Sequence, residues 1–203
     1  VLDTAKAVNI LVSEAGDNLM AFNGAGVLKR KLKPLIAVPT TAGTGSEVTL
    51  AAVIADPAHN RKLLFSSYFL LPDVAIIDSR MTLTLPAHIT AATAMDALTH
   101  AVESCMCLAS NPLSKAYAYE AIDLIRCHLL AVVKNPGDKE GRLALAIAAT
   151  LAGMAFSNAM VGMVHTLGHS VGSVCHIAHG TCMAILLPYG MEYNYHKIED
   201  RLA

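Results

Sequence analysis

The side chains best suited to chemistry in this chain are one aspartate and several histidines at regular spacings. Asp96 and His100 are four residues apart, and His165, His169 and His179 follow later in the sequence. Residues four apart on a helix share a face, so each such pair can reach one ion. A carboxylate combined with imidazoles suits Fe(II), Zn(II) or another divalent transition ion. We therefore predict a metal site.

The sequence around the later histidines carries no formal charge. Residues 143–191 contain no Asp, Glu, Lys or Arg, yet they hold four of the nine histidines. A buried imidazole needs a partner, and a metal ion is the simplest common one. The alternative is that these are core histidines with ordinary hydrogen bonds and that Asp96 caps a helix. His176 is off the four-residue spacing, and we expect at most a supporting contact from it.

A glycine-rich segment at residues 40–47 directly follows an apolar run that ends at Pro39. Two glycines allow a tight turn that exposes backbone N–H groups, and the threonines and Ser46 add hydroxyl donors. These groups suit a phosphate-binding loop. A plain left-handed turn with capping hydroxyls explains the same residues.

Composition limits the class of protein. The chain has 203 residues, 54% of them hydrophobic and 15% charged, with a net charge of −1, so we predict a globular protein without a nucleic-acid surface. Residues 143–164 are long enough to span a bilayer, but they are rich in Ala and Gly, so we predict a buried core helix and no membrane partner. The five cysteines form no Cys-x2-Cys pair, and no signal-peptide pattern is present, which favours reduced thiols and a cytoplasmic location.

The elements that must position these groups change character near Pro86. Before it, a helix from Asp3 to Val12 and buried strands at 35–39 and 74–77 predict a partial parallel α/β layer, with a turn at 57–60 between two further segments. After it, periodicity predicts helices only: 87–108, 112–134, 139–156, 161–174 and 180–193, the last interrupted by Pro188. We predict an α/β plus all-α fold, with a partial dinucleotide-binding domain at 1–86 and a helical metal-binding domain at 87–203.

Three collinear motifs together resemble the iron-containing (group III) alcohol dehydrogenases. They are Pro39-Thr-Thr-Ala-Gly-Thr-Gly-Ser-Glu47, Met95-Asp-Ala-Leu-Thr-His-Ala-Val-Glu103 and His165-x3-His169-x9-His179-Gly180. The resemblance implies a Rossmann-like nucleotide domain and a helical metal domain of the dehydroquinate synthase-like kind, with the active site between them. The Asp-x3-His pair favours the iron branch over the related zinc branches.

The resemblance also implies roles for individual residues. The metal ligands fall on Asp96, His100, His165 and His179, and His169 matches the family's catalytic-site histidine that does not bind the metal. The cofactor-contacting positions fall on two stretches and one lysine: Thr40, Thr41, Ala42, Gly43, Thr44; Lys62; and Met81, Thr82, Leu83, Thr84, Leu85. Ala51 stands where relatives can carry a polar cofactor contact.

By this resemblance we expect a metal-dependent, NAD- or NADP-linked dehydrogenase. It would move a hydride between a small alcohol or aldehyde and the nicotinamide, with Fe(II) or Zn(II) polarising the substrate oxygen. Asp3-x-x-Lys6 matches a family motif whose preceding glycine loop is not in this sequence, so we expect an internal fragment that associates as a homo-oligomer. The alternative is an inactive fragment or a metal-binding module without dehydrogenase activity.

Overall fold

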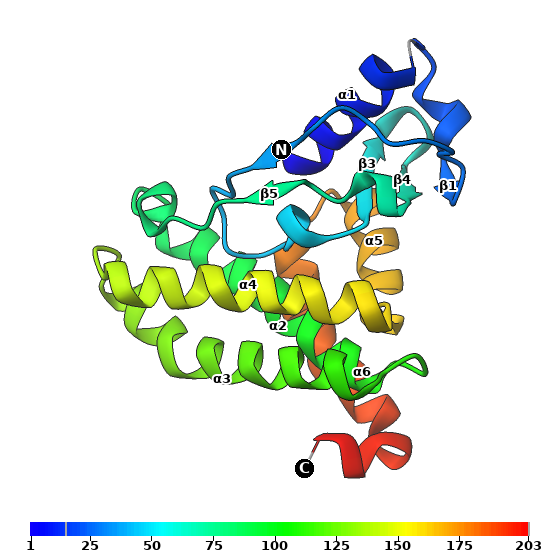
Figure 1. Cartoon of the computed structure of the whole chain (residues 1–203). Coiled ribbons are helices and arrows are strands. Elements are labelled where there is room, and N and C mark those ends of the chain that lie inside the picture. The colour runs from blue at the N-terminus through cyan, green and yellow to red at the C-terminus, as the bar shows by residue number, and fades with distance from the viewer. Residues whose placement is uncertain (15, 203) are drawn as a thin grey trace.

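The computed structural model describes residues 1–14 and 16–202, without the side chains of 199–202. Figure 1 shows helix α1 and the short strands on one side of the molecule, α4 across its middle and α3 beyond α4. The elements before Pro86 are α1 (Leu2–Glu14), β1 (Gly24–Ala25), β2 (Ile36–Ala37), β3 (Ala51–Asp56), β4 (Arg61–Ser66) and β5 (Val74–Ala75). The helices after it are α2 (Ala87–Met106), α3 (Pro112–Lys134), α4 (Lys139–Ala159), α5 (Met163–Cys175) and α6 (His179–Leu202). The predicted α/β plus all-α class is confirmed.

The strands form two small sheets, and the two predicted buried strands pair in parallel as expected. β2 pairs with β5 in parallel, whereas β4 pairs in parallel with β1 and antiparallel with β3. The antiparallel pair arises because the predicted turn at Pro57 is short, which brings β4 straight back beside β3. Asn60 closes this turn in the left-handed conformation, with φ 48°. A short turn can only join antiparallel strands.

An aliphatic and aromatic cluster holds the first half of the chain together. Ile10 of α1, Ala52 of β3 and Phe65 of β4 are at most 1% exposed and pack together. Removing side chains of this size from water is the dominant favourable contribution to folding. The cluster fixes β3 and β4 against α1, and β4 carries Lys62 toward the helices that follow.

The helices of the second half pack through small residues. Buried alanines of α2, α3 and α4, including Ala97, Ala121, Ala148 and Ala152, form one core. α4 is the one described helix that is long and apolar enough to cross a membrane by length and composition. Here it packs against α2 and α3, as predicted for a core helix.

Local signals account for the starts of α3 and α4. Asn111 caps α3 by accepting hydrogen bonds from the N–H groups of Leu113 and Ser114, and Pro112 occupies the first helical position. Asp138 caps α4 through the N–H of Gly141. The predicted interruption at Pro188 is wrong, because α6 continues through this residue. Packing of α6 on α2 and α5 compensates for the missing hydrogen bond, and the neighbouring Leu187 is buried.

Candidate metal centre

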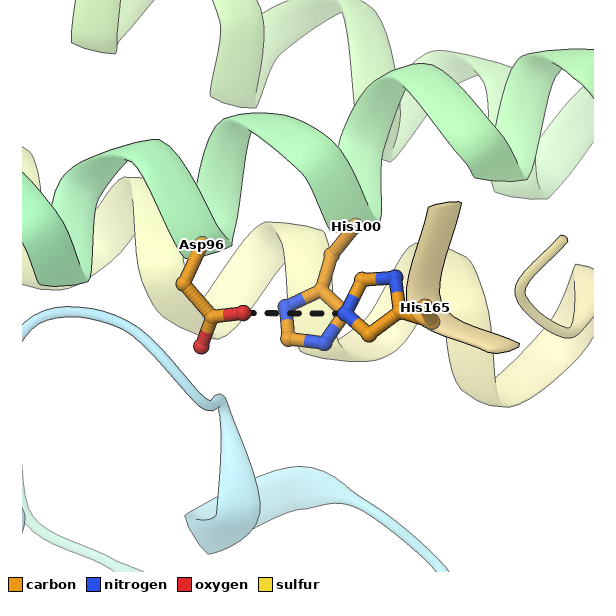
Figure 2. Close-up of side chains that lie close together, drawn as sticks. All are labelled: Asp96, His100 and His165. Atoms are coloured by element: carbon orange, nitrogen blue, oxygen red, sulfur yellow. Dashed lines mark ion pairs between the residues drawn. The ribbon is translucent and has the colours of Figure 1, made fainter. Parts of the chain in front are cut away.

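Helix α2 presents an aspartate and a histidine on one buried face. Asp96 and His100 are 3% and 6% exposed. Their four-residue spacing puts both side chains on the face that meets α5, and Figure 2 shows them projecting toward His165. The ring of His100 stacks between Phe156 of α4 and His165, with centroid distances of 4.4 and 4.3 Å. Aromatic contacts on both sides restrict the rotation of this imidazole.

His165 and His179 approach Asp96 from two other helices. The Nε2 atoms of these histidines lie 3.6 and 3.3 Å from Oδ1 of Asp96. His179 begins α6, and a Cβ on the following Gly180 would clash with the carbonyl oxygen of Ala92 on α2. Only glycine therefore allows α6 to start so close to α2, which places His179 beside Asp96.

Three buried polar atoms at this point have no hydrogen-bond partner. They are Oδ1 of Asp96, Nδ1 of His100 and Nε2 of His165. Leaving several buried acceptors unpaired is unfavourable, and native structures rarely do so without a ligand. Ligand atoms of these three residues lie within 4.8 Å of one another. Donors bound at 2.0–2.2 Å to one tetrahedral ion are about 3.4 Å apart, so the arrangement fits a transition metal.

At Asp96 and His100, electrostatics favour the charge states that bind a cation. Burial lowers the pKa of His100 to about 3, with the carboxylate of Asp96 opposing the shift, so this imidazole is neutral. Burial alone would raise the pKa of Asp96, but the surrounding histidines outweigh it and hold that pKa well below its usual value. Burial disfavours a charged His165 as well, yet the nearby carboxylates of Asp96 and Glu103 raise its pKa to about 9. A metal ion would replace the proton on its Nε2.

His169 lies beside this cluster without belonging to it. Its ring is 6.0 Å from that of His165 and 5.0 Å from that of His179, measured between centroids. Burial and the nearby Lys62 lower its pKa to about 3. The equal four-residue spacing of Asp96–His100 and His165–His169 therefore leads to different environments. His176, at the left-handed end of α5, is exposed.

Glu103 is a site residue to which the sequence analysis assigned no role. It lies seven residues after Asp96 and three after His100, on the same face of α2, and it is 0% exposed. Its carboxylate lies 2.5 Å from Nδ1 of His165. The signal in the sequence was a carboxylate at helical spacing from two predicted ligands.

A cavity of about 490 Å³ opens onto the cluster from the α/β side. It is lined by the cluster residues, by His169 and Phe156, and by residues of β3, β4 and the glycine-rich segment. Of the predicted cofactor-contacting residues, Thr44 and Lys62 line it. Nζ of Lys62 lies 3.5 Å from Nδ1 of His179. Residues from both halves of the chain, 1–86 and 87–203, therefore line this one cavity.

The other predicted cofactor residues lie outside the lining of this cavity. Thr40 is exposed, Thr41 is half-buried, and Ala42 and Gly43 are buried where the segment meets α2. The 81–85 stretch leads into α2, with Thr82 buried and the carbonyl oxygen of Leu85 accepting a hydrogen bond from Arg142. The remaining residues of this stretch, Met81, Leu83 and Thr84, are exposed or half-buried.

The two glycines of the segment pack against helices. A Cβ on Gly43 would lie 2.9 Å from Cβ of Thr93 on α2, and one on Gly45 would lie 2.6 Å from Cα of Gly153 on α4. Gly45 is also left-handed, with φ 60°, as a tight turn requires. The hydroxyl of Ser46 donates to Asp3 at 2.5 Å, so it serves the fold instead of standing free.

Comparison with known proteins identifies this arrangement. The protein-family model described as "Iron-containing alcohol dehydrogenase" matches residues 1–79 of the chain. A second family model, "Fe-containing alcohol dehydrogenase family, C-terminal", matches residues 90–203. The chain belongs to the iron-containing alcohol dehydrogenase family. Together the two matches cover the glycine-rich segment and every residue of the cluster.

Curated relatives of the chain include alcohol and methanol dehydrogenases. The chain is 42% identical to the probable alcohol dehydrogenase EutG of Escherichia coli strain K12, over all of this chain and 51% of that protein. It is 38% identical to the NAD-dependent methanol dehydrogenase of Bacillus methanolicus, over 99% of this chain and 52% of the relative. The chain thus spans about half the length of the curated relatives it matches.

Solved structures of the family superpose closely on the structure of this chain. The alcohol dehydrogenase from Oenococcus oeni matches with a TM-score of 0.94 at 40% identity, over 98% of this chain and 52% of that one. Sulfoacetaldehyde reductase from Bifidobacterium kashiwanohense, solved with NAD+, matches with a TM-score of 0.84 at 31% identity, over 95% and 51%. The fold around the cluster is therefore that of the family.

Proposed function

We propose that this chain carries the metal centre and part of the cofactor site of an NAD- or NADP-linked alcohol dehydrogenase. The observation that carries the proposal is the set of unpaired buried ligand atoms on Asp96, His100 and His165, completed by His179 and opening onto a cavity. These four residues would hold Fe(II) or Zn(II). When bound, the ion supplies Lewis acidity toward an alcohol or aldehyde oxygen.

The residues of the chain then bind and orient the reactants. The cavity presents Phe156, Val161 and other apolar side chains beside the cluster, which suits a small uncharged alcohol or aldehyde and excludes water. Thr44 and Lys62 line the wall that residues 1–86 contribute to the cavity, where a nicotinamide cofactor would enter between residues 1–86 and 87–203. The remaining predicted cofactor residues would contact the cofactor beyond this wall.

His169 is suited to handle the proton at this site. It lines the cavity next to His179, and its ring is neutral because burial and Lys62 lower its pKa to about 3, so it can order a water molecule or relay a proton through hydrogen bonds. Replacing His169 with Ala should lower hydride transfer by roughly 100-fold while leaving metal content unchanged. Loss of the metal in this variant would contradict the separation of His169 from the ligand set.

The cellular context follows from the same residues. The structure shows no disulfide among the five described cysteines, and we propose a cytoplasmic protein. We expect a homo-oligomer, and a monomer in light scattering would contradict this expectation. No contact with a membrane or with nucleic acid is part of the proposal.

Elemental analysis of the chain purified without air and without added metal tests the proposal directly. The expected result is about one equivalent of iron or zinc per chain. No transition metal, and no uptake on adding Fe(II) or Zn(II), would overturn the metal site. Metal uptake without NAD- or NADP-linked alcohol oxidation would instead support a metal-binding module without dehydrogenase activity.

A further inference from the structure

Glu103 is a buried carboxylate that no step of the proposed reaction uses. It lies on α2, three residues after His100, and is fully buried. Its one described ion pair is with His165, and no Lys or Arg among the described side chains neutralises it. Burying such a charge is unfavourable unless hydrogen bonds compensate for it. The contacts that compensate here all come from the start of α5.

Two of these contacts fix where α5 begins. The backbone N–H of Val164 donates to one carboxylate oxygen at 2.6 Å, and that of His165 approaches the other at 3.4 Å. The first N–H groups of a helix need acceptors, and the N-cap residue Gly162 provides none. Glu103 therefore caps α5 from a neighbouring helix, where the helix dipole also favours negative charge. A Cβ at Gly162 would lie 3.0 Å from this carboxylate, so glycine leaves room for it.

The third contact fixes the ring of His165. Its Nδ1 lies 2.5 Å from Oε2 of Glu103, and a carboxylate can only accept a hydrogen bond. Nδ1 therefore carries the proton, and in the neutral ring the lone pair belongs to Nε2. That atom points toward Asp96 and lacks a hydrogen-bond partner. A metal ion binds a histidine nitrogen that has no proton.

We propose that Glu103 is a positioning residue for the metal centre. It holds α5 in place relative to Asp96 and His100, and it selects the His165 tautomer that offers Nε2 to the ion. This inference rests on the proposed function, and it adds a residue that controls the affinity of the site without binding the metal itself.

Replacement of Glu103 by Gln separates this role from simple packing. Three donors converge on the carboxylate, which offers two oxygens, whereas the amide of Gln offers one oxygen and an NH₂ group. If the NH₂ group faces His165, Nδ1 must become an acceptor and Nε2 carries the proton. If it faces Val164, two donors meet at a distance of 2.6 Å. Either arrangement should weaken metal binding, although Gln has the same size as Glu and leaves the packing unchanged.

The first experiment measures Zn(II) affinity of the whole chain by competition with a chelator. We expect Glu103→Gln to bind Zn(II) about 10–100-fold more weakly than wild type. Glu47→Gln is the matched control, because Glu47 is also a buried carboxylate, but its partner is the hydroxyl of Thr150 at 2.7 Å. It should bind Zn(II) like wild type. If Glu103→Gln binds Zn(II) as tightly as wild type, the proposed role of Glu103 is overturned, but the metal site itself is not.

The second experiment can be decided on the wild-type protein, and the variant serves as a comparison. A ¹⁵N–¹H correlation spectrum of the histidine rings in Zn(II)-loaded wild type should show a slowly exchanging proton on Nδ1 of His165. In a folded Glu103→Gln protein this signal should be lost or strongly shifted. An Nδ1 without a proton in wild type would overturn the proposal even if the variant fails to fold. Wild type that takes up no Zn(II) would overturn both this proposal and the metal site.

Discussion

The metal cluster and the glycine-rich segment face the same cavity, but they are held in place differently. In the cluster, rigid helices carry side chains whose polar atoms remain unpaired, such as Oδ1 of Asp96. In the segment, backbone glycines touch helices directly, and Ser46 uses its hydroxyl for an internal hydrogen bond. The cluster keeps its chemical groups available for a ligand, whereas the segment uses its own mainly to fix its position.

This difference shows why the histidines and the glycines of the sequence are informative for different physical reasons. A histidine in an uncharged stretch is informative because its polar atoms need a partner. A glycine is informative through the space it leaves, and Gly45 leaves space for Gly153 of α4 as well as adopting a left-handed turn. The segment thereby lies against the same helical core that holds the metal ligands.

The largest expected effect is the loss of metal from the cluster. Asp96→Ala and His165→Ala would each remove one of the four proposed ligands. The three remaining donors would not complete the coordination of the ion, so Zn(II) or Fe(II) should not be retained through gel filtration. Metal content per chain is the measurement. His176→Ala is the matched control, because His176 is exposed at the end of α5, and it should retain the metal. Full retention in both ligand variants would contradict the ligand assignment.

A smaller effect is expected where the segment meets α4. A Cβ at position 153 would lie 2.9 Å from the backbone of Gly45, so Gly153→Ala forces the two apart. We expect the free energy of unfolding to fall by about 1–3 kcal/mol, the usual range for overpacking. Chemical denaturation measures this change, and metal affinity should stay at the wild-type value.

The control for this prediction is Gly137→Ala. A Cβ at Gly137 would meet only Asn135, at 3.6 Å, so the substitution should leave the free energy of unfolding nearly unchanged. If Gly153→Ala is as stable as Gly137→Ala, the close contact between segment and helix has no energetic importance. If Gly153→Ala also loses the metal, the two regions are less independent than the comparison proposes.

An effect of similar size is expected as a pH dependence of stability at Lys6. Nζ of Lys6 is buried and donates to the carbonyl oxygens of Thr49 and Ala51 at 2.7 and 2.9 Å. Burial lowers its pKa to about 8, although Asp3 and Glu47 oppose the shift. Below pH 8 the folded and unfolded chains both carry this proton, and the unfavourable burial of the charge is fully present.

Between pH 8 and 10.5 the unfolded chain binds more of this proton than the folded chain, so the contribution of Lys6 to stability rises with pH. Relative to Lys6→Met, the wild-type free energy of unfolding should increase by about 1–3 kcal/mol across this window. Denaturation of both proteins at several pH values measures the difference. A difference that is constant with pH would mean that Lys6 keeps an ordinary pKa.

Several features were predicted correctly because their causes are local in the sequence. The Asn111-Pro112 start of α3 depends on a cap and a fixed φ angle, both set by neighbouring residues. The shared face of Asp96 and His100 follows from helical spacing alone. The predictions failed where neighbours in space decide. Helix α6 continues through Pro188 because it packs against other helices.

The sequence by itself determined the chemical types at the site, their order and the helices that carry them. Only the tertiary structure decided that Nε2 of His165 lies 3.6 Å from Oδ1 of Asp96, whereas His169, four residues later, packs beside His179. It also decided that Glu103 reaches His165 across 62 positions of the chain. Helical spacing fixes which side chains share a face, but the contacts of that face depend on how α2, α5 and α6 pack, and packing is a property of the whole core.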